Sequence, residues 1–150
     1  MTKLFRTNAV NPDFIELVKS LDADLEIRDG EEHSFYDQFN KLENIKHVIV
    51  AYDDEMPIAC GAIKKYDGDT VELKRMFVAQ NSRRKGIATK ILIELEHLAK
   101  ELSYTKCILE TGVNQPEAIE LYKKNGYRII ANYGQYENAE NSICFEKTLN

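Results

Sequence analysis

The sequence predicts a mixed α/β fold, a three-layer sandwich in which one sheet lies between two layers of helices. Three β-like runs joined by short turn signals in the middle of the chain predict antiparallel hairpins. A strand, a long apolar-periodic helix and another strand then follow one another, which predicts one parallel crossover. The 150 residues are enough for one buried core, so we expect a single domain over residues 1–150.

The expected elements of the first half are a strand near Lys3–Thr7, a helix from about Pro12, a loop with a short helix over Gly30–Leu42, and strands near His47–Tyr52, Ile58–Tyr66 and Val71–Val78. The first helix is predicted from apolar side chains at helical spacing, namely Phe14, Leu17, Val18, Leu21 and Leu25. Turn signals at residues 53–55 and 67–69 separate the three strands.

The expected elements of the second half are a helix over roughly Arg84–Ser103, a strand over Thr105–Thr111, a helix from Asn114 to Gly126, and strands near Tyr127–Tyr133 and Ser142–Thr148. Asn114 is placed as the N-cap of its helix, with Pro116 in the first turn and Glu117 completing a capping box. Gly126 is placed to end that helix in a left-handed conformation. The predicted order is therefore β-α-α-β-β-β-α-β-α-β-β.

The composition excludes several classes of protein. The net charge of -5 and pI of about 5.3 argue against nucleic-acid binding, because the basic residues are clustered too locally. No apolar run approaches the roughly 20 residues that cross a bilayer, and the N-terminus lacks a signal-peptide core, so no membrane association is expected. Three well-separated cysteines without a metal-binding spacing indicate buried reduced thiols, a cytoplasmic location and no metal site.

The basic turn between Val78 and Leu92 is the most informative stretch of the chain. Six cations lie between positions 74 and 90 without an acidic residue, namely Lys74, Arg75, Arg83, Arg84, Lys85 and Lys90. A strand that enters a helix through a basic turn containing Gly86 is suited to phosphate, because the first helical N–H groups and the helix dipole face the anion. The alternative is an ordinary solvated basic helix start.

Two motifs in this region resemble those of the GNAT N-acetyltransferases. Arg83-x-x-Gly86-Ile87-Ala88, with Val78 five residues upstream, is similar to the acetyl-coenzyme A signature of that family. The motif departs from the family signature at two positions. Gln80 stands where Pro is frequent, and Arg84 stands where a small residue is common. Neither change removes a group that a pyrophosphate needs. The pattern N-x-x-x-A-x-x-L-Y-x-x-x-G-Y over residues 114–127 is similar to the second family motif. The resemblance covers about residues 48–149.

The resemblance implies a fold with the predicted order of elements and acetyl-coenzyme A as co-substrate. In such a fold the two central strands splay apart, and pantetheine enters the gap like an additional strand. The implied cofactor-binding residues are Met76, Phe77, Val78, Arg83, Arg84, Lys85, Gly86, Ile87, Ala88, Thr89, Asn114, Ala118 and Tyr122. Asn114 has the alternative role of capping its helix.

The implied reaction is direct acyl transfer from a thioester to an amine. An alkylamine of pKa ~10.4 must lose a proton at pH 7, which costs about 4–5 kcal/mol, so the site needs a general base. Glu72 is the candidate base, acting directly or through water, and its alternative role is that of a solvent-facing strand residue. Tyr122 occupies the general-acid position of the family motif, and its alternative role is a core tyrosine. A main-chain N–H near Phe77 or Val78 would stabilise the oxyanion.

The acceptor is not specified by the sequence. Thirteen acidic residues against four basic ones between Asn11 and Glu55 slightly favour a small cationic amine, although a solvated acidic surface explains them equally well. Tyr133 and Tyr136 are candidates for the mouth of the site. Polyamines, amino-acid derivatives, antibiotics and protein amines all remain open, as does a homodimer. The alternative to an enzyme is a non-catalytic sensor that binds acyl-coenzyme A.

Overall fold

The structure is a computed structural model that describes residues 1–29 and 45–150. The expected loop with a short helix over Gly30–Leu42 lies outside the described residues. The strands are β1 (Thr2–Thr7), β2 (His47–Asp53), β3 (Met56–Lys65), β4 (Thr70–Val78), β5 (Lys106–Gly112), β6 (Arg128–Ile130) and β7 (Ser142–Thr148). The helices are α1 (Pro12–Asp29), α3 (Ile87–Glu101) and α4 (Pro116–Lys124), with short 3-10 turns η2 (Gln80–Ser82) and η3 (Gly134–Tyr136).

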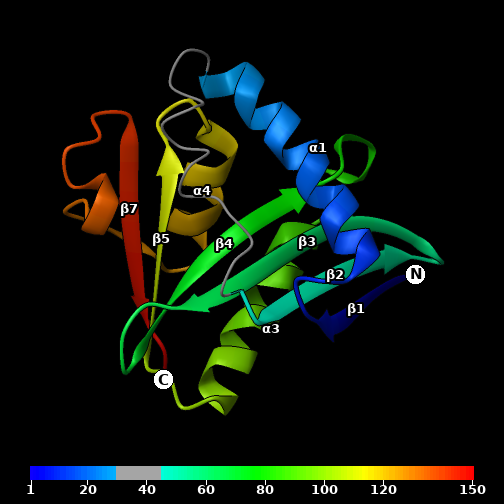
Figure 1. Cartoon of the computed structure of the whole chain (residues 1–150), viewed down its shortest axis with the longest axis horizontal. Coiled ribbons are helices and arrows are strands. Elements are labelled where there is room, and N and C mark those ends of the chain that lie inside the picture. Colours follow the sequence, from blue (N-terminus) through cyan, green and yellow to red (C-terminus); the bar gives the residue numbers. More distant parts are fainter. Residues whose placement is uncertain (30–44) are drawn as a thin grey trace.

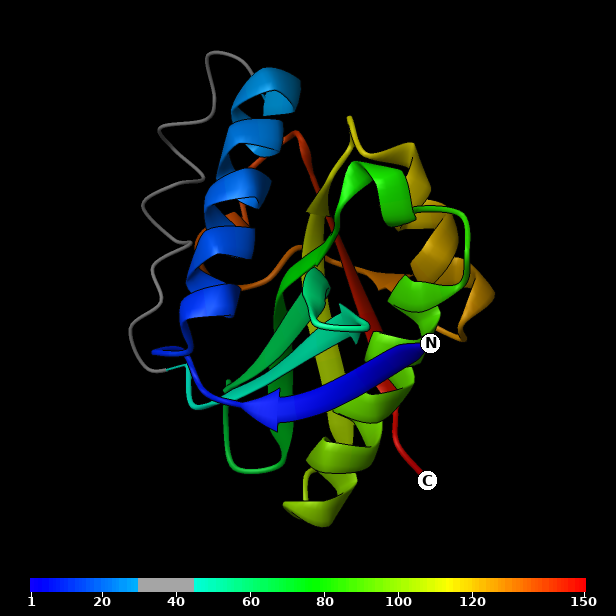
Figure 2. The same ribbon diagram turned by 90° about the vertical axis from the view of Figure 1, so that its right-hand side faces the viewer.

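One mixed sheet runs through the described part of the chain in the order β1-β2-β3-β4-β5-β7-β6 (Figure 1). Neighbouring strands are antiparallel except β4 and β5, which are parallel and joined through α3. Figure 2 shows α1 on one face of the sheet and α3 with α4 on the other. The prediction of a mixed α/β three-layer fold with a single parallel crossover is confirmed.

The two faces of the sheet have separate hydrophobic cores. On the α1 face, Phe14, Leu17 and Val18 pack with Val48, Val50, Ile45, Cys60 and Ala62. On the other face, buried residues of α3 such as Ile91 and Leu95 pack with Val71, Leu73 and Leu109. Because side chains alternate along a strand, Glu72 and Lys74 of β4 face the α1 side.

The ends of two helices differ from the sequence-based expectation. Helix α3 begins at Ile87 rather than Arg84, because Arg84 and Gly86 both adopt left-handed backbone angles, with φ of 66° and 76°. The N-cap of α4 is Gln115 without a side-chain cap bond, so the prediction of Asn114 as N-cap was wrong. The Gln115 carbonyl accepts the first helical bond from the Ile119 N–H, because Pro116 is the first residue with helical geometry.

Two other local predictions, at Gly126 and at the cysteines, are confirmed. Gly126 has φ of 90°, the left-handed angle expected after a helix. The final hairpin strand is shorter than predicted, covering only Arg128–Ile130 of β6. Cys60, Cys107 and Cys144 are free thiols and all three are buried. Among the described residues no group of side chains is arranged to hold a metal ion, and no described helix has the length and apolarity to cross a membrane.

Strands β4 and β5 pair only at their beginnings. Thr70–Glu72 pair with Lys106–Ile108, and beyond that point the two strands diverge toward their carboxyl ends (Figure 1). A β-bulge accompanies the divergence, because Cys60 of β3 pairs with Phe77 while Ala62 pairs with Lys74. Two residues of β4, at positions 75 and 76, therefore lie opposite the single β3 residue Gly61. The first of them is Arg75, whose φ is 59°.

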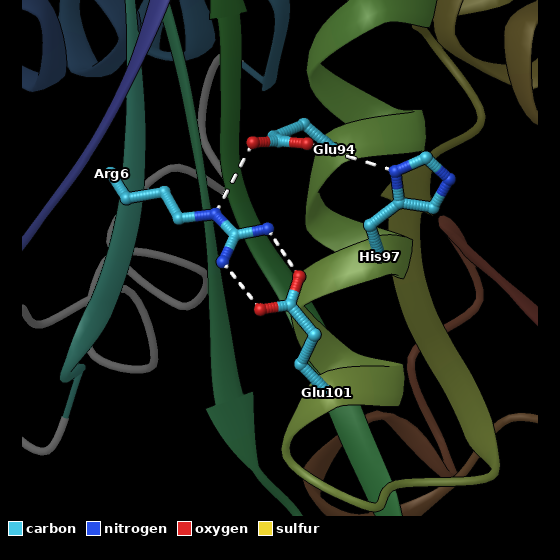
Figure 3. Close-up of polar contacts among 4 residues, drawn as sticks. All are labelled: Arg6, Glu94, His97 and Glu101. Carbon is cyan, nitrogen blue, oxygen red and sulfur yellow. Dashed lines mark hydrogen bonds and ion pairs between the residues drawn. The ribbon is translucent and has the colours of Figure 1, made fainter.

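An ionic cluster attaches the edge strand β1 to helix α3 (Figure 3). The Arg6 guanidinium donates to both carboxylate oxygens of Glu101, at 2.8 and 2.6 Å, and its Nε donates to Glu94 at 3.2 Å. Glu94 also lies 3.7 Å from Nδ1 of His97, which projects from the exposed side of α3. The hydrogen bond from Arg6 lowers the pKa of Glu101. These contacts are on the surface, so their role is to orient β1 and α3 rather than to supply much stability.

Candidate active site

A cleft of about 760 Å³ opens where β4 and β5 separate. Its walls come from α1, β4, the basic turn, the start of α3, the end of β5, α4 and η3. The predicted site residues that line it are Glu72, Met76, Phe77, Val78, Arg83, Arg84, Gly86, Ile87, Ala88, Thr89, Ala118 and Tyr122. Two predicted residues, Lys85 and Asn114, are exposed and are not among the lining residues. The two motifs, far apart in the sequence, therefore meet at one cleft.

The basic turn is shaped by Arg83. Its Nε donates a hydrogen bond of 2.8 Å to the Val78 carbonyl, and its guanidinium lies 5.7 Å from the centre of the Phe77 ring. A longer ion pair of 3.7 Å joins it to Asp24 of α1. Arg83 thus holds the end of β4 against the start of the turn, a structural task that the phosphate-binding interpretation did not include.

Helix α3 points its amino terminus into the cleft. Gly86 precedes the helix, and its carbonyl accepts the first helical bond from the Lys90 N–H at 3.2 Å. An added Cβ at Gly86 would meet nothing within 4 Å, so the left-handed φ of 76° is what favours glycine there. The first N–H groups of α3 have no partners within the helix and are suited to an anion.

Two of the six cations lie away from the basic turn. Lys74 and Arg75 are only 8% and 7% exposed, and both line the cleft. Lys74 Nζ lies 3.8 Å from Glu72, and Arg75 Nη2 lies 3.1 Å from Asp22 of α1. Burial lowers the pKa of Lys74. The sequence grouped these residues with the basic turn because it could not show that the bulge directs Arg75 to the α1 side, which Lys74 faces by regular alternation.

Glu72 is buried in the cleft wall, so its alternative reading as a solvent-facing residue was wrong. It is 6% exposed, and its Oε2 accepts a 2.6 Å hydrogen bond from the Tyr133 hydroxyl. Burial and the Glu72 charge raise the pKa of Tyr133, which keeps this phenol a donor. The Tyr133 ring is held edge-on against Tyr66 and Tyr136, with centroids 5.3 and 5.9 Å away.

Tyr122 belongs both to the core and to the cleft. It is 5% exposed, its ring packs against Tyr127 and Phe145 with centroids 5.7 and 5.9 Å away, and it lines the cleft. Burial, and then the charge of Glu110, raise its pKa, so the phenol stays protonated at neutral pH. The two sequence interpretations of Tyr122 are therefore compatible.

Sequence reasoning did not propose Glu110 or Thr111, which also line the cleft. Glu110 accepts a 2.6 Å hydrogen bond from the Ser142 hydroxyl, and its charge acts on Lys74, Tyr122 and Tyr136. It follows Ile108, the register partner of Glu72, by two residues, so strand alternation places it on the same face as Glu72. That alternation was the available signal. Tyr136, suggested for the mouth, is 2% exposed and does line the cleft.

Comparison with known proteins identifies the class. A model of the acetyltransferase (GNAT) family matches residues 14–127. An IAA acetyltransferase from Azospirillum brasilense is 30% identical over 137 residues, which are 90% of this chain and 90% of that protein. The chain therefore belongs to the GNAT family and is an acetyl-coenzyme A-dependent N-acetyltransferase.

Solved structures show the same fold. A protein from Klebsiella pneumoniae, assigned as an acyl-CoA N-acyltransferase, has a TM-score of 0.84 and 26% identity, with 99% of this chain and 98% of that chain covered. A GNAT family acetyltransferase from Elizabethkingia anophelis, solved with acetyl-coenzyme A bound, has a TM-score of 0.73 and 21% identity, with 99% and 98% covered.

Proposed function

We propose that this enzyme moves the acetyl group of acetyl-coenzyme A directly to the primary amine of a small acceptor, with Glu72 as general base and Tyr122 as general acid. The observation that carries the proposal is that these two buried residues, 6% and 5% exposed, line one cleft from β4 and α4. The acceptor reaches the enzyme as an ammonium ion, and a protein amine is the alternative acceptor.

The cofactor is proposed to enter between β4 and β5. Their unpaired carboxyl-terminal halves leave backbone groups that can bond the pantetheine amides, as an added strand would. The diphosphate is proposed to bind the N–H groups at the start of α3, where Arg84 and Lys85 supply exposed positive charge. We also propose that Asn114, which precedes the lining residue Gln115, contacts the cofactor.

The acid and base steps follow from the surroundings of the two residues. Glu72 takes a proton from the ammonium group, directly or through a water molecule, which frees the nitrogen lone pair to attack the thioester carbon. A main-chain N–H near Phe77 or Val78 stabilises the oxyanion. When the C–S bond breaks, the Tyr122 hydroxyl gives its proton to the departing thiolate. Tyr122 is suited to this step because its raised pKa keeps the proton on the phenol until then. The attacking nitrogen then loses its additional proton, which returns to the Tyr122 oxygen directly or through water and leaves a neutral amide.

Carboxylates in the cleft support an acceptor that arrives as a cation. Asp24, Glu72 and Glu110 all line it, and Glu72 and Glu110 lie on the same face of the sheet. Among the described acidic residues of the range 11–55, Asp24 is the one that lines the cleft, so the sequence-based acidic wall is supported at that position. Carboxylates at a concave site raise the local concentration of an ammonium ion.

The test replaces Tyr122 by phenylalanine and follows both binding and turnover. We expect acetyl-coenzyme A to raise the melting temperature of Tyr122→Phe as it does for the wild type, while kcat with an accepted amine falls tenfold or more. The matched control is Tyr127→Phe, which removes a buried hydroxyl bonded to Glu96 outside the cleft and should keep its kcat. Unchanged turnover in Tyr122→Phe would remove Tyr122 from the mechanism.

A further inference from the structure

We propose that the acceptor carries an anionic group, a carboxylate, in addition to its amine, and that Arg75 and Lys74 bind this group. The acceptor would then be an amino acid or a close relative of one. This inference rests on the proposed function, because it assigns the acceptor of the same cleft.

The β4 bulge is the first observation. In a regular strand Lys74 and Arg75 would point to opposite faces, but Lys74 lies by Glu72 and Arg75 reaches Asp22 on α1. The bulge thus brings two consecutive cations to the same side of the sheet, where both line the cleft. The backbone of Arg75 has φ of 59°, a conformation that costs energy in a residue other than glycine and is typical of functional sites.

The hydrogen bonding of Arg75 is the second observation. Its side chain is 4% exposed, and the contacts of its guanidinium to Asp22 all use Nη2. Its Nε is buried and has no hydrogen-bond partner. Buried polar groups in native proteins nearly always have partners, and a guanidinium matches a carboxylate best through two parallel N–H bonds. A small adjustment of the side chain would let a carboxylate in the cleft use Nε together with a terminal nitrogen.

The charges along the central strands are the third observation. Glu72 and Glu110 are two carboxylates, and Lys74 and Arg75 are two cations, all lining the cleft from β4 and β5. A molecule with one ammonium and one carboxylate group matches both pairs, whereas a simple amine matches the two carboxylates alone. Burial lowers the pKa of Lys74, and an added anion beside it would favour its charged form.

The anion could in principle come from either substrate. The proposed phosphate site is at the start of α3, beyond the end of β4, whereas Arg75 contacts α1. We therefore assign the anion to the acceptor, and the experiment separates the two sources by measuring KM for acetyl-coenzyme A as well as for the acceptor.

The experiment compares amino acids with the amines that they give on decarboxylation, for example phenylalanine with phenethylamine and leucine with isoamylamine. Release of free coenzyme A thiol measures the rate. For the wild type we expect kcat/KM at least tenfold higher for the best amino acid than for its matched amine. In Arg75→Gln, KM for the amino acid should rise tenfold or more, with kcat/KM for the amine and KM for acetyl-coenzyme A changed less than threefold.

Two further variants separate binding from structure. Asp22→Asn removes the ion-pair partner and leaves Arg75 in place, so it should keep the preference for the amino acid. Arg75→Lys should recover part of the lost affinity because it keeps the charge. If Arg75→Gln does not fold, Arg75→Lys still decides the question, because the anion site predicts a larger loss for the amino acid than for its matched amine, whereas a purely structural Arg75 predicts equal losses for both acceptors.

The outcomes distinguish the two proposals. A wild-type enzyme that acetylates the matched amines as well as the amino acids, or a loss in Arg75→Lys equal for both acceptors, would overturn the anion site and leave the proposed function standing. A rise in KM for acetyl-coenzyme A alone in Arg75→Gln would assign the anion to the cofactor and overturn the inference. A wild-type enzyme that binds acetyl-coenzyme A but acetylates no member of either set would overturn the proposed small-amine function itself.

Discussion

Replacing Gly61 by alanine should destabilise the protein through one well-defined clash. Gly61 is the β3 residue that faces the β4 bulge, and an added Cβ would lie 2.5 Å from Sδ of Met76. It would also lie 2.8 Å from a methyl group of Ile91 and 2.9 Å from one of Leu95, both on α3. All three distances are shorter than Cβ contacts in folded proteins allow, so side chains must move.

The magnitude follows from how far these neighbours can move. Ile91 and Leu95 are fully buried and have no open space to enter, whereas Met76 is only partly buried and has a flexible side chain. Overpacking of a close-packed core by one methyl group costs about 1–3 kcal/mol. For a domain of this size each kcal/mol lowers the melting temperature by about 2–4 °C, so the expected fall is roughly 2–12 °C.

Thermal unfolding followed by circular dichroism measures this effect. The matched control is Gly68→Ala, because an added Cβ at Gly68 would meet nothing within 4 Å. The control should stay within about 0.5 kcal/mol of the wild type, as surface substitutions usually do. Since Met76 lines the cleft, Gly61→Ala should also raise KM for acetyl-coenzyme A. Equal melting temperatures for the two variants would refute the packing argument at the bulge.

Two further predictions concern single polar contacts. Tyr133→Phe removes the 2.6 Å hydrogen bond to Glu72. Because a hydrogen bond to a carboxylate contributes ~1.5–3 kcal/mol, kcat should fall about tenfold or more. An unchanged steady-state kcat would contradict this prediction. The hydrogen bond from Arg128, aided by Lys106, lowers the pKa of Glu146, so its stabilisation is present at pH 7 and is lost as pH falls below about 4.5. Glu146→Gln should therefore lower the urea midpoint more at pH 7 than at pH 3, and a deficit of equal size at both pH values would show another cause.

Sequence reasoning was most successful where structure depends on neighbours along the chain. The alternation of apolar residues located β4, and helical spacing located α1 and α3. Gly126 was placed correctly because a left-handed residue at a helix end leaves a local signature. The prediction of the α4 cap was wrong by one position, because the N-cap is Gln115 rather than Asn114. The start of the helix is set by Pro116.

The sequence by itself determined the mixed α/β class, the basic turn before α3, and Tyr122 in its motif. Only the tertiary structure decided that Tyr133 bonds Glu72, 61 positions earlier, and that Arg75 reaches Asp22. The physical reason is register. A one-residue bulge in β4 reverses which face each following side chain takes, and it leaves no pattern in the local sequence. The contacts of Glu72 and Arg75 both depend on how segments distant in the sequence are paired.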